Sequence, residues 1–178
     1  MTLRIGNAAT ARYRRAMQRN ALLLILLGSV AVVGGALLTQ YVGGLVPCEL
    51  CLLERWPYYI GIPVALLTLI AGRHRAPASI GAAVLALIFI GSSGLAFYHA
   101  GVERHWFEGP SACTASTTVA TTIEQLRAQL MATQPVLCDQ PQWSFHGLTL
   151  AGLNVLASLG LALLSLVALR AALSRRRS

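Results

Sequence analysis

The sequence contains no lysine and little charge of either sign, since only 11% of its 178 residues are charged. A soluble domain usually carries about 25% charged residues, so this scarcity excludes an ordinary soluble globule and a disordered tail. All fourteen basic residues are arginines, against six acidic residues, and the formal net charge is +8. The arginines lie mainly at the ends of long apolar runs and do not form a stripe on a polar face, which argues against a nucleic acid partner. With 56% hydrophobic residues, the chain is expected to lie in a lipid bilayer.

Four apolar runs are each long enough to cross a bilayer as a helix. A helix of 22 residues extends about 33 Å, and the hydrocarbon core of a bilayer is about 30 Å thick. The runs lack the period-two alternation that the strands of a membrane barrel would show. The sequence therefore predicts an all-α membrane protein, a bundle of four transmembrane helices within a single domain of residues 21–170. The helices are expected at about 21–42, 52–71, 78–99 and 147–169.

The arginines also predict the orientation of the helices. Eleven of them lie in the N-terminal segment (1–20), in the turn at 73–75 and near the C-terminus (Arg170 and the tail at 171–178), and only Arg55, Arg104 and Arg127 lie elsewhere. Because arginine is enriched on the cytoplasmic side of membrane proteins, both termini are expected in the cytoplasm. Two loops, at about 43–51 and 100–146, then face outward.

The four cysteines all fall in these two loops, with Cys48 and Cys51 in the first and Cys113 and Cys138 in the second. Two structural disulfides are one interpretation, because thiols outside the cytosol are usually oxidised. A disulfide within Cys48-Glu49-Leu50-Cys51 would hardly restrain the unfolded chain, however, since stabilisation grows with loop length. The Cys-x-x-Cys spacing is also typical of redox-active dithiols.

The surroundings of the first cysteine pair favour redox chemistry. Arg55 follows Cys51 by four residues, so on a helix it would lie one turn away and favour the thiolate. A zinc ion held by all four sulfurs is a third interpretation, but Arg55 would repel the ion. Pro57 and Pro63 are expected to bend or locally unwind the second helix.

Other polar and aromatic side chains in the apolar runs have structural interpretations. Trp56, Tyr58 and Tyr59 are expected to form an aromatic belt at the membrane interface, with a role in lining a binding pocket as the secondary interpretation. Asn154 is expected to make a hydrogen bond between helices.

Taken together, the motifs resemble one known family. They are Pro47-Cys48-Glu49-Leu50-Cys51, Glu54-Arg55, Tyr98-His99 with Gly101-Val102-Glu103, Gly109-Pro110 before Cys113, and Gln142-Trp143-Ser144-Phe145 after Cys138. With the four helices, they resemble the disulfide bond formation protein B (DsbB) family of bacterial inner-membrane quinone reductases. The likeness covers residues 20–170.

The resemblance implies a relay of disulfide exchange on the periplasmic side of the inner membrane. A redox-active pair, Cys113–Cys138, would reoxidise a periplasmic DsbA-type thioredoxin-like oxidase, with Cys113 forming the mixed disulfide. Electrons would pass to a second redox-active pair, Cys48–Cys51, through an interloop disulfide between Cys48 and Cys138.

The resemblance also implies an electron acceptor. Cys51 would reduce a membrane quinone, ubiquinone or menaquinone, which feeds the respiratory chain. Arg55 would bind and polarise the quinone, and His99 would correspond to the family histidine beside it; no metal ion is expected. Two alternatives stay open: a dedicated paralogue (DsbI-like) that serves a narrow substrate set, and a membrane assembly subunit with inert disulfides.

Overall fold

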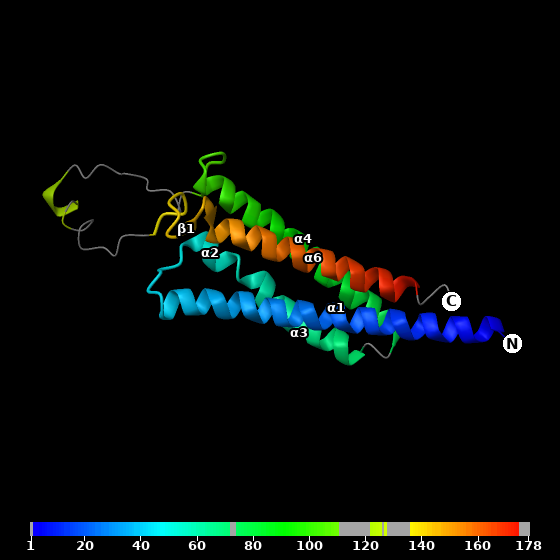
Figure 1. The fold of residues 1–178 in the computed structure, drawn as a ribbon. Helices are drawn as coiled ribbons and strands as arrows, with labels where there is room; N and C mark the ends of the chain where they lie inside the picture. Colours follow the sequence, from blue (N-terminus) through cyan, green and yellow to red (C-terminus); the bar gives the residue numbers. More distant parts are fainter. Residues whose placement is uncertain (1, 72–73, 111–121, 126, 128–135, 175–178) are drawn as a thin grey trace.

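The computed structural model describes residues 2–71, 74–110, 122–125, 127 and 136–174. The chain folds into long helices with a short hairpin near one end of the bundle (Figure 1). In chain order the elements are α1 (Thr2–Tyr41), α2 (Glu49–Leu53), α3 (Trp56–Ile70), α4 (Arg75–Glu103), β1 (Ser144–Phe145), β2 (Leu148–Thr149) and α6 (Leu150–Ser174).

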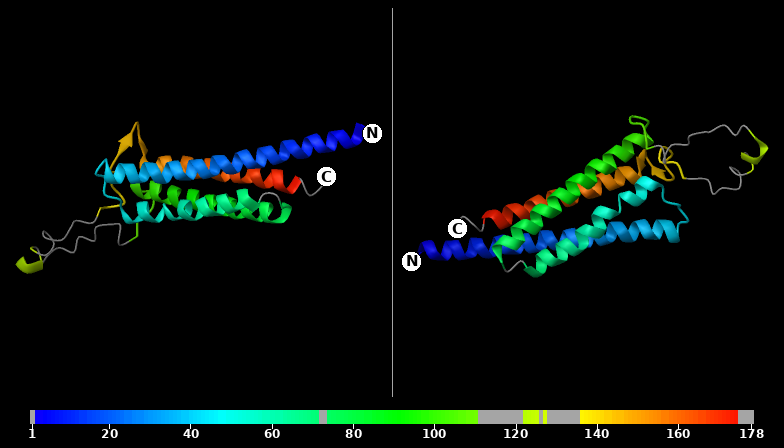
Figure 2. Two further views of the ribbon diagram at one scale, coloured as in Figure 1. Left: turned by 90° about the horizontal axis from the view of Figure 1, so that it is seen from below. Right: turned by 180° about the vertical axis from the view of Figure 1, so that it is seen from behind.

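The four longer helices pack as a closed ring. Helix α4 contacts α6 and α3, and α1 contacts the same two helices from the other side. Both ends of the described chain lie at one end of this bundle, while α2 and the hairpin lie at the opposite end (Figure 2). The arginine-rich N-terminal segment and the cysteine motif therefore lie at opposite ends of the bundle.

Three of the helices are long and apolar enough to cross a membrane: Ala9–Tyr41, Ala76–Glu103 and Leu150–Ser174. Their packing is that of a membrane protein, since small residues such as Ala82, Ala168 and Ser165 are buried while Leu27, Leu87 and many other large apolar side chains are exposed. Helix α3 has 15 residues, and at a rise of about 1.5 Å per residue it spans only about 22 Å.

The segment expected as the second helix, 52–71, is divided close to Pro57, where bending or unwinding was expected, since α2 ends at Leu53 and α3 begins at Trp56. Pro57 explains the break, since it has no N–H group and its ring would clash with the carbonyl of Leu53, four residues earlier. Proline is tolerated in the first turn of a helix, and Pro57 occupies that place in α3. Pro63, in contrast, lies inside α3, which continues past it.

The other helix boundaries also differ from the expected ones. Helix α1 already begins at Thr2, so the arginine-rich N-terminal segment is helical, and α4 continues to Glu103 instead of ending near residue 99. The fourth helix begins at Leu150 and not at residue 147, because the hairpin β1–β2 precedes it.

The hairpin is the one departure from an all-α chain among the described residues. Ser144 pairs with Thr149 and Phe145 with Leu148. The two residues between the strands, His146 and Gly147, both have positive φ, at 51° and 78°, as a two-residue turn of type I′ requires.

Candidate functional site

The Cys-x-x-Cys motif begins α2 at the end of the bundle away from the termini. Cys48 is the N-cap residue, and its sulfur accepts a hydrogen bond from the backbone N–H of Cys51 at 3.3 Å. The two sulfur atoms are 2.7 Å apart, and both cysteines are free thiols. The structure thus holds the motif as a hydrogen-bonded dithiol, and a redox-active disulfide between Cys48 and Cys51 stays a prediction.

A histidine and a carboxylate stand behind this dithiol. Nε2 of His99, in the last turns of α4, lies 3.7 Å from the sulfur of Cys48. Nδ1 of the same ring lies 2.8 Å from Oε1 of Glu54, at the break between α2 and α3. His99 and Glu54 are only 2% and 6% exposed. Because a carboxylate can only accept, the His99 proton sits on Nδ1, and Nε2 is left to face the sulfur.

The hydrogen bonds divide the two thiols electrostatically. The pKa of Cys48 is lowered to about 4, first by the hydrogen bond with Cys51 and then, against the effect of burial, by His99. The pKa of Cys51 is raised, because its proton is held in the hydrogen bond to Cys48 and because the thiol is buried. Cys48 is therefore the thiolate of the pair. Outside the motif, His99 is the main side chain that lowers the pKa of Cys48. The sequence had indicated Arg55 for this role.

Arg55 extends toward the end of α1. Its Nη1 donates a hydrogen bond to Oε1 of Gln40 at 2.6 Å, and the side chain is half-buried. Both residues line a cavity of about 340 Å³. The fixed cation thus lies at the wall of the same cavity as the dithiol.

This cavity gathers nearly all the predicted site residues. Its walls are largely aliphatic, from α1 and α6, and small-molecule sites are typically concave and mostly apolar with a few polar groups. Among the residues that line it are Cys48, Cys51, Glu54, Arg55, Tyr58, His99, Cys138, Trp143 and Asn154.

The second cysteine pair is described only in part. Cys138 is 1% exposed and lies in one buried cluster with Cys48, Leu50 and Val102. It is disulfide-bonded, so a zinc ion held by four thiolates does not fit the structure. Cys113 lies outside the described residues, and the Cys113–Cys138 pairing stays a prediction.

The structure buries Tyr58 and Glu54, a placement that the sequence did not lead us to expect. Tyr58 was expected in the interfacial belt, but it is 1% exposed and its hydroxyl donates to Oδ1 of Asn154 at 2.5 Å. Trp56 and Tyr59 are 60% and 42% exposed, as a belt requires. The bond from Tyr58 on α3 to α6 is the interhelical hydrogen bond expected of Asn154, which also donates from Nδ2 to Oε2 of Glu54 at 2.7 Å. An acidic residue beside an apolar run was the available signal for Glu54.

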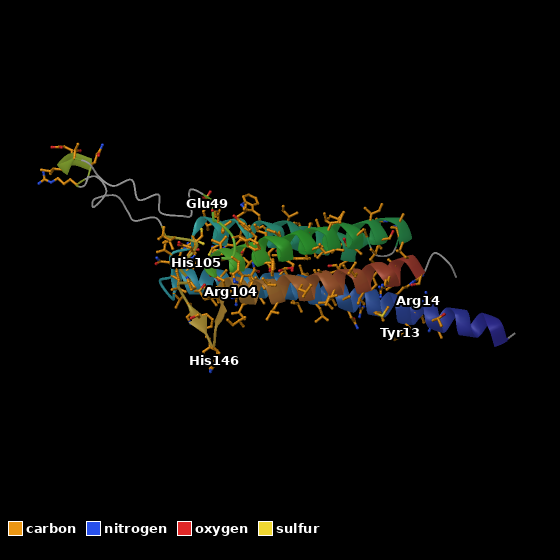
Figure 3. The ribbon with its side chains drawn as sticks, turned by 90° about the horizontal axis from the view of Figure 1, so that it is seen from above. Tyr13, Arg14, Glu49, Arg104, His105 and His146 are labelled. Carbon is orange, nitrogen blue, oxygen red and sulfur yellow. The ribbon has the colours of Figure 1, made fainter. Side chains whose placement is uncertain are left out.

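The charged surface at this end lies outside the cavity. Glu49, Arg104, His105 and His146 surround the end that carries the motif, while Tyr13 and Arg14 lie toward the opposite end (Figure 3). The guanidinium of Arg104 lies 5.4 Å from the ring centre of Trp106, and Arg104 is exposed. It therefore offers a comparison for Arg55, at the same end of the bundle but outside the cavity.

A helical membrane protein with a buried dithiol beside an apolar cavity belongs to the class of membrane thiol oxidoreductases. The family model of the disulfide bond formation protein DsbB matches residues 18–168, and the chain belongs to this family. Membership supports an oxidoreductase role in disulfide bond formation.

Curated relatives agree with the family at modest identity. A disulfide bond formation protein B of Polaromonas sp. strain JS666 is 28% identical over 163 residues, which cover 87% of this chain and 92% of the relative. One of Herminiimonas arsenicoxydans is 33% identical over 87 residues, or 49% of this chain and 54% of the relative. A protein of Rickettsia prowazekii strain Madrid E, described as uncharacterised, is 25% identical over 140 residues, or 77% and 79%. No solved structure matches the chain significantly.

Proposed function

We propose that this protein takes electrons from a periplasmic DsbA-type thioredoxin-like oxidase and passes them to a membrane quinone, ubiquinone or menaquinone. The reaction would support disulfide bond formation in exported proteins. The observation that carries the proposal is the cavity, because Cys48, Cys51, Cys138, Arg55 and His99 all line it. Residues from both predicted cysteine pairs thus meet at one place with the predicted quinone ligands.

The residues of the cavity suit a quinone ring. Oxidation of two thiols to a disulfide releases two electrons and two protons, and a quinone accepts both to become a quinol. The aliphatic walls supplied by α1 and α6 suit the apolar ring. Arg55 supplies a fixed cation where negative charge would develop on an oxygen, and such a cation acts strongly in a water-poor site.

The relay would run through thiolate attack at each exchange. The attacking species in disulfide exchange is the thiolate, so in the forward direction a thiolate of the reduced loop pair would attack the Cys48–Cys51 disulfide at Cys48. The lowered pKa of Cys48 would make it the thiolate that closes the disulfide with Cys51 again when the dithiol gives two electrons to the quinone. Cys48 and Cys138 lie in one buried cluster, which supports an interloop exchange between them. Each 30 mV of potential difference in this two-electron step corresponds to about 1.4 kcal/mol, so an oxidising quinone can draw an unfavourable exchange forward.

The proposed setting is the bacterial inner membrane, with four crossings, both termini in the cytoplasm and the cysteines on the periplasmic side. Helix α3 would be the short fourth crossing, extended at the cysteine end by α2. The bundle supports this topology because Arg14, in the N-terminal segment, and Glu49, between the two cysteines of the motif, lie at opposite ends (Figure 3). Reporter fusions at the N- and C-termini test it, and a periplasmic C-terminus would contradict the relay.

An assembly subunit with inert disulfides is the competing function. The small ring that a Cys48–Cys51 disulfide would close and the buried His99, 3.7 Å from the Cys48 sulfur, favour redox chemistry over an inert staple. A paralogue with a narrow substrate set would share the chemistry and differ only in its thiol donors.

The decisive experiment is quinone reduction by the purified protein in detergent, with a reduced thioredoxin-like protein as electron donor. We expect quinol formation that depends on the donor and is abolished by Cys51→Ser. Ser165→Ala is the matched control, because this buried serine on α6 bonds only within its own helix, to the carbonyl of Leu161. Quinol formation no faster than the uncatalysed rate with every donor and quinone tried would refute the proposal.

A further inference from the structure

A continuous chain of polar contacts crosses the bundle at the break between α2 and α3. It begins at Tyr58 on α3, whose hydroxyl donates to Asn154 on α6 at 2.5 Å. Asn154 donates to Glu54 at 2.7 Å, and Glu54 accepts from His99 on α4 at 2.8 Å. The chain ends 3.7 Å from His99, at the sulfur of Cys48.

Glu54 is the member of this chain whose placement needs an explanation. A buried carboxylate is costly unless it is paired and hydrogen-bonded, and Glu54 is only 6% exposed. Its neighbour in sequence, Arg55, bonds instead to Gln40. Both carboxylate oxygens of Glu54 are occupied, one by His99 and the other by Asn154. The carboxylate is thus aimed at the histidine and not at the adjacent arginine.

We propose that Tyr58 and Asn154 are positioning residues that hold the Glu54 carboxylate against His99, so that His99 takes the proton of Cys48. In this step the S–H bond of Cys48 breaks and an N–H bond forms at Nε2 of His99. The electron pair stays on the sulfur, which becomes the thiolate. The imidazolium that results keeps its Nδ1–H bond to the Glu54 carboxylate, which stabilises the positive charge. The inference rests on the proposed function, in which the Cys48 thiolate closes the disulfide with Cys51 as the reduced dithiol passes its two electrons to the quinone.

The roles along the chain follow from its chemistry. An imidazole can take a proton and a carboxylate can stabilise the ion that forms, as in other cysteine–histidine pairs oriented by a third group. An asparagine amide does not titrate, so Asn154 ends the proton-handling part of the chain and serves as an anchor. Tyr58 fixes the orientation of that amide, because the Tyr58 hydroxyl donates to its oxygen.

The break in the second apolar run makes this arrangement possible. Pro57 ends α2 before Glu54, so Glu54 lies at the junction and not on the face of a continuous helix. The junction faces α4, which carries His99, and α6, which carries Asn154. The anchor therefore also fixes the orientation of the junction.

Several other groups face Cys48 and His99 and could affect proton transfer. Cys51 comes from α2, Glu103 from α4, and Arg55 and Tyr58 from the junction and α3, and all four line the same cavity. From α1 and α6 the polar groups that line it are the uncharged Thr39, Gln40 and Asn154. Cys138 is disulfide-bonded and does not titrate. The test must therefore vary the anchor while leaving these groups in place.

The experiment measures the pH dependence of Cys48 alkylation by iodoacetamide, in the full-length reduced protein in detergent, with the label located by mass spectrometry. A Cys51→Ala background removes the hydrogen bond that dominates the pKa of Cys48 and leaves His99 as its partner. In this background Asn154→Leu and Tyr58→Phe should each move the midpoint upward by about one pH unit, as expected for the loss of one hydrogen bond supporting a charged group. Glu54→Gln should move it at least as far. Ser165→Ala should leave it unchanged.

Unchanged midpoints in Tyr58→Phe and Asn154→Leu would overturn the positioning role, whatever Glu54→Gln does. Tyr58→Phe keeps the ring that packs against Phe89 at 5.8 Å between centres, so it tests the proposal even where Asn154→Leu fails to fold. A purely structural role would lower thermal stability without moving the midpoint, and this too would refute it. Alkylation needs neither quinone nor partner, so failure of quinone reduction together with shifted midpoints would refute the proposed function alone.

Discussion

Replacement of Arg55 by glutamine removes the guanidinium from the wall of the cavity, where it donates a 2.6 Å hydrogen bond to Gln40. Glutamine keeps a polar, hydrogen-bonding side chain of lesser length. We expect Arg55→Gln to weaken quinone reduction while leaving the protein folded and inserted. Arg55→Lys should be milder but not neutral, since an ammonium cannot reproduce the planar guanidinium fork.

The magnitude follows from the charge and its surroundings. A unit charge about 4 Å from a full negative charge contributes up to about 4 kcal/mol at an effective dielectric constant near 20. Arg55 is half-buried, and the charge on a quinone oxygen is partial in the transition state, so about 1.4 to 2.8 kcal/mol is expected. At about 1.36 kcal/mol per tenfold, kcat/KM for the quinone should fall about 10- to 100-fold.

Steady-state kinetics over a quinone titration measure this effect, at a saturating concentration of a small dithiol donor. Arg104→Gln is the matched control, because Arg104 is an exposed arginine at the same end of the bundle that lies over Trp106. Gln40→Leu keeps the charge but removes its anchor, and we expect it to lower kcat/KM less than Arg55→Gln does.

Unchanged kcat and KM for the quinone in Arg55→Gln would refute the reasoning. Equal activity of Arg55→Lys and the unmodified protein, with a loss of membrane insertion in Arg55→Gln, would show instead that Arg55 only carries its charge to the lipid interface.

Three further predictions concern the thiols and the packing of the bundle. Cys51→Ser should abolish quinone reduction with any donor, while Cys113→Ala should mainly block electron transfer from the protein partner. Stopped-flow measurement with a small dithiol donor distinguishes the two variants. Equal losses of activity with that donor would contradict the division of roles. Because the pKa of Cys48 is lowered to about 4, Cys48 should be a thiolate between pH 6 and 9, which is about two units or more above that pKa. The rate of its alkylation in the reduced protein should therefore stay nearly constant over this range. A rate that rises tenfold per pH unit would disprove the prediction. A Cβ added at Gly61 would lie 2.8 Å from Cζ of the buried Phe89, so Gly61→Ala should destabilise the bundle by about 1 to 3 kcal/mol. Gly91→Ala is the control in the same thermal unfolding measurement, because a Cβ there would meet nothing within 4 Å. Equal melting temperatures of the two variants would contradict the close packing of Gly61 against Phe89.

Local sequence determined the membrane character, the Cys-x-x-Cys dithiol and the break at Pro57. Long apolar runs bury their backbone in a helix because lipid offers no hydrogen-bonding partner. Proline interrupts a helix wherever its missing N–H and its ring are not tolerated. Each of these properties depends on residues within one or two helical turns, so residues that are neighbours in the sequence are enough to predict it. The cysteine spacing and the proximity of Arg55 to the motif are local in the same sense.

Only the tertiary structure decided which polar groups meet. Cys48 and His99 are 51 residues apart in the sequence, and Asn154 and Glu54 are 100 apart. In a soluble helix the polar face shows which side is inward, but these helices are apolar on nearly every side, so their sequence does not reveal whether Tyr58 or Tyr59 faces the core. That choice follows from the rotation and axial position of each helix in the ring, where small residues permit close packing. The same packing turns Glu54 toward His99 instead of its neighbour Arg55.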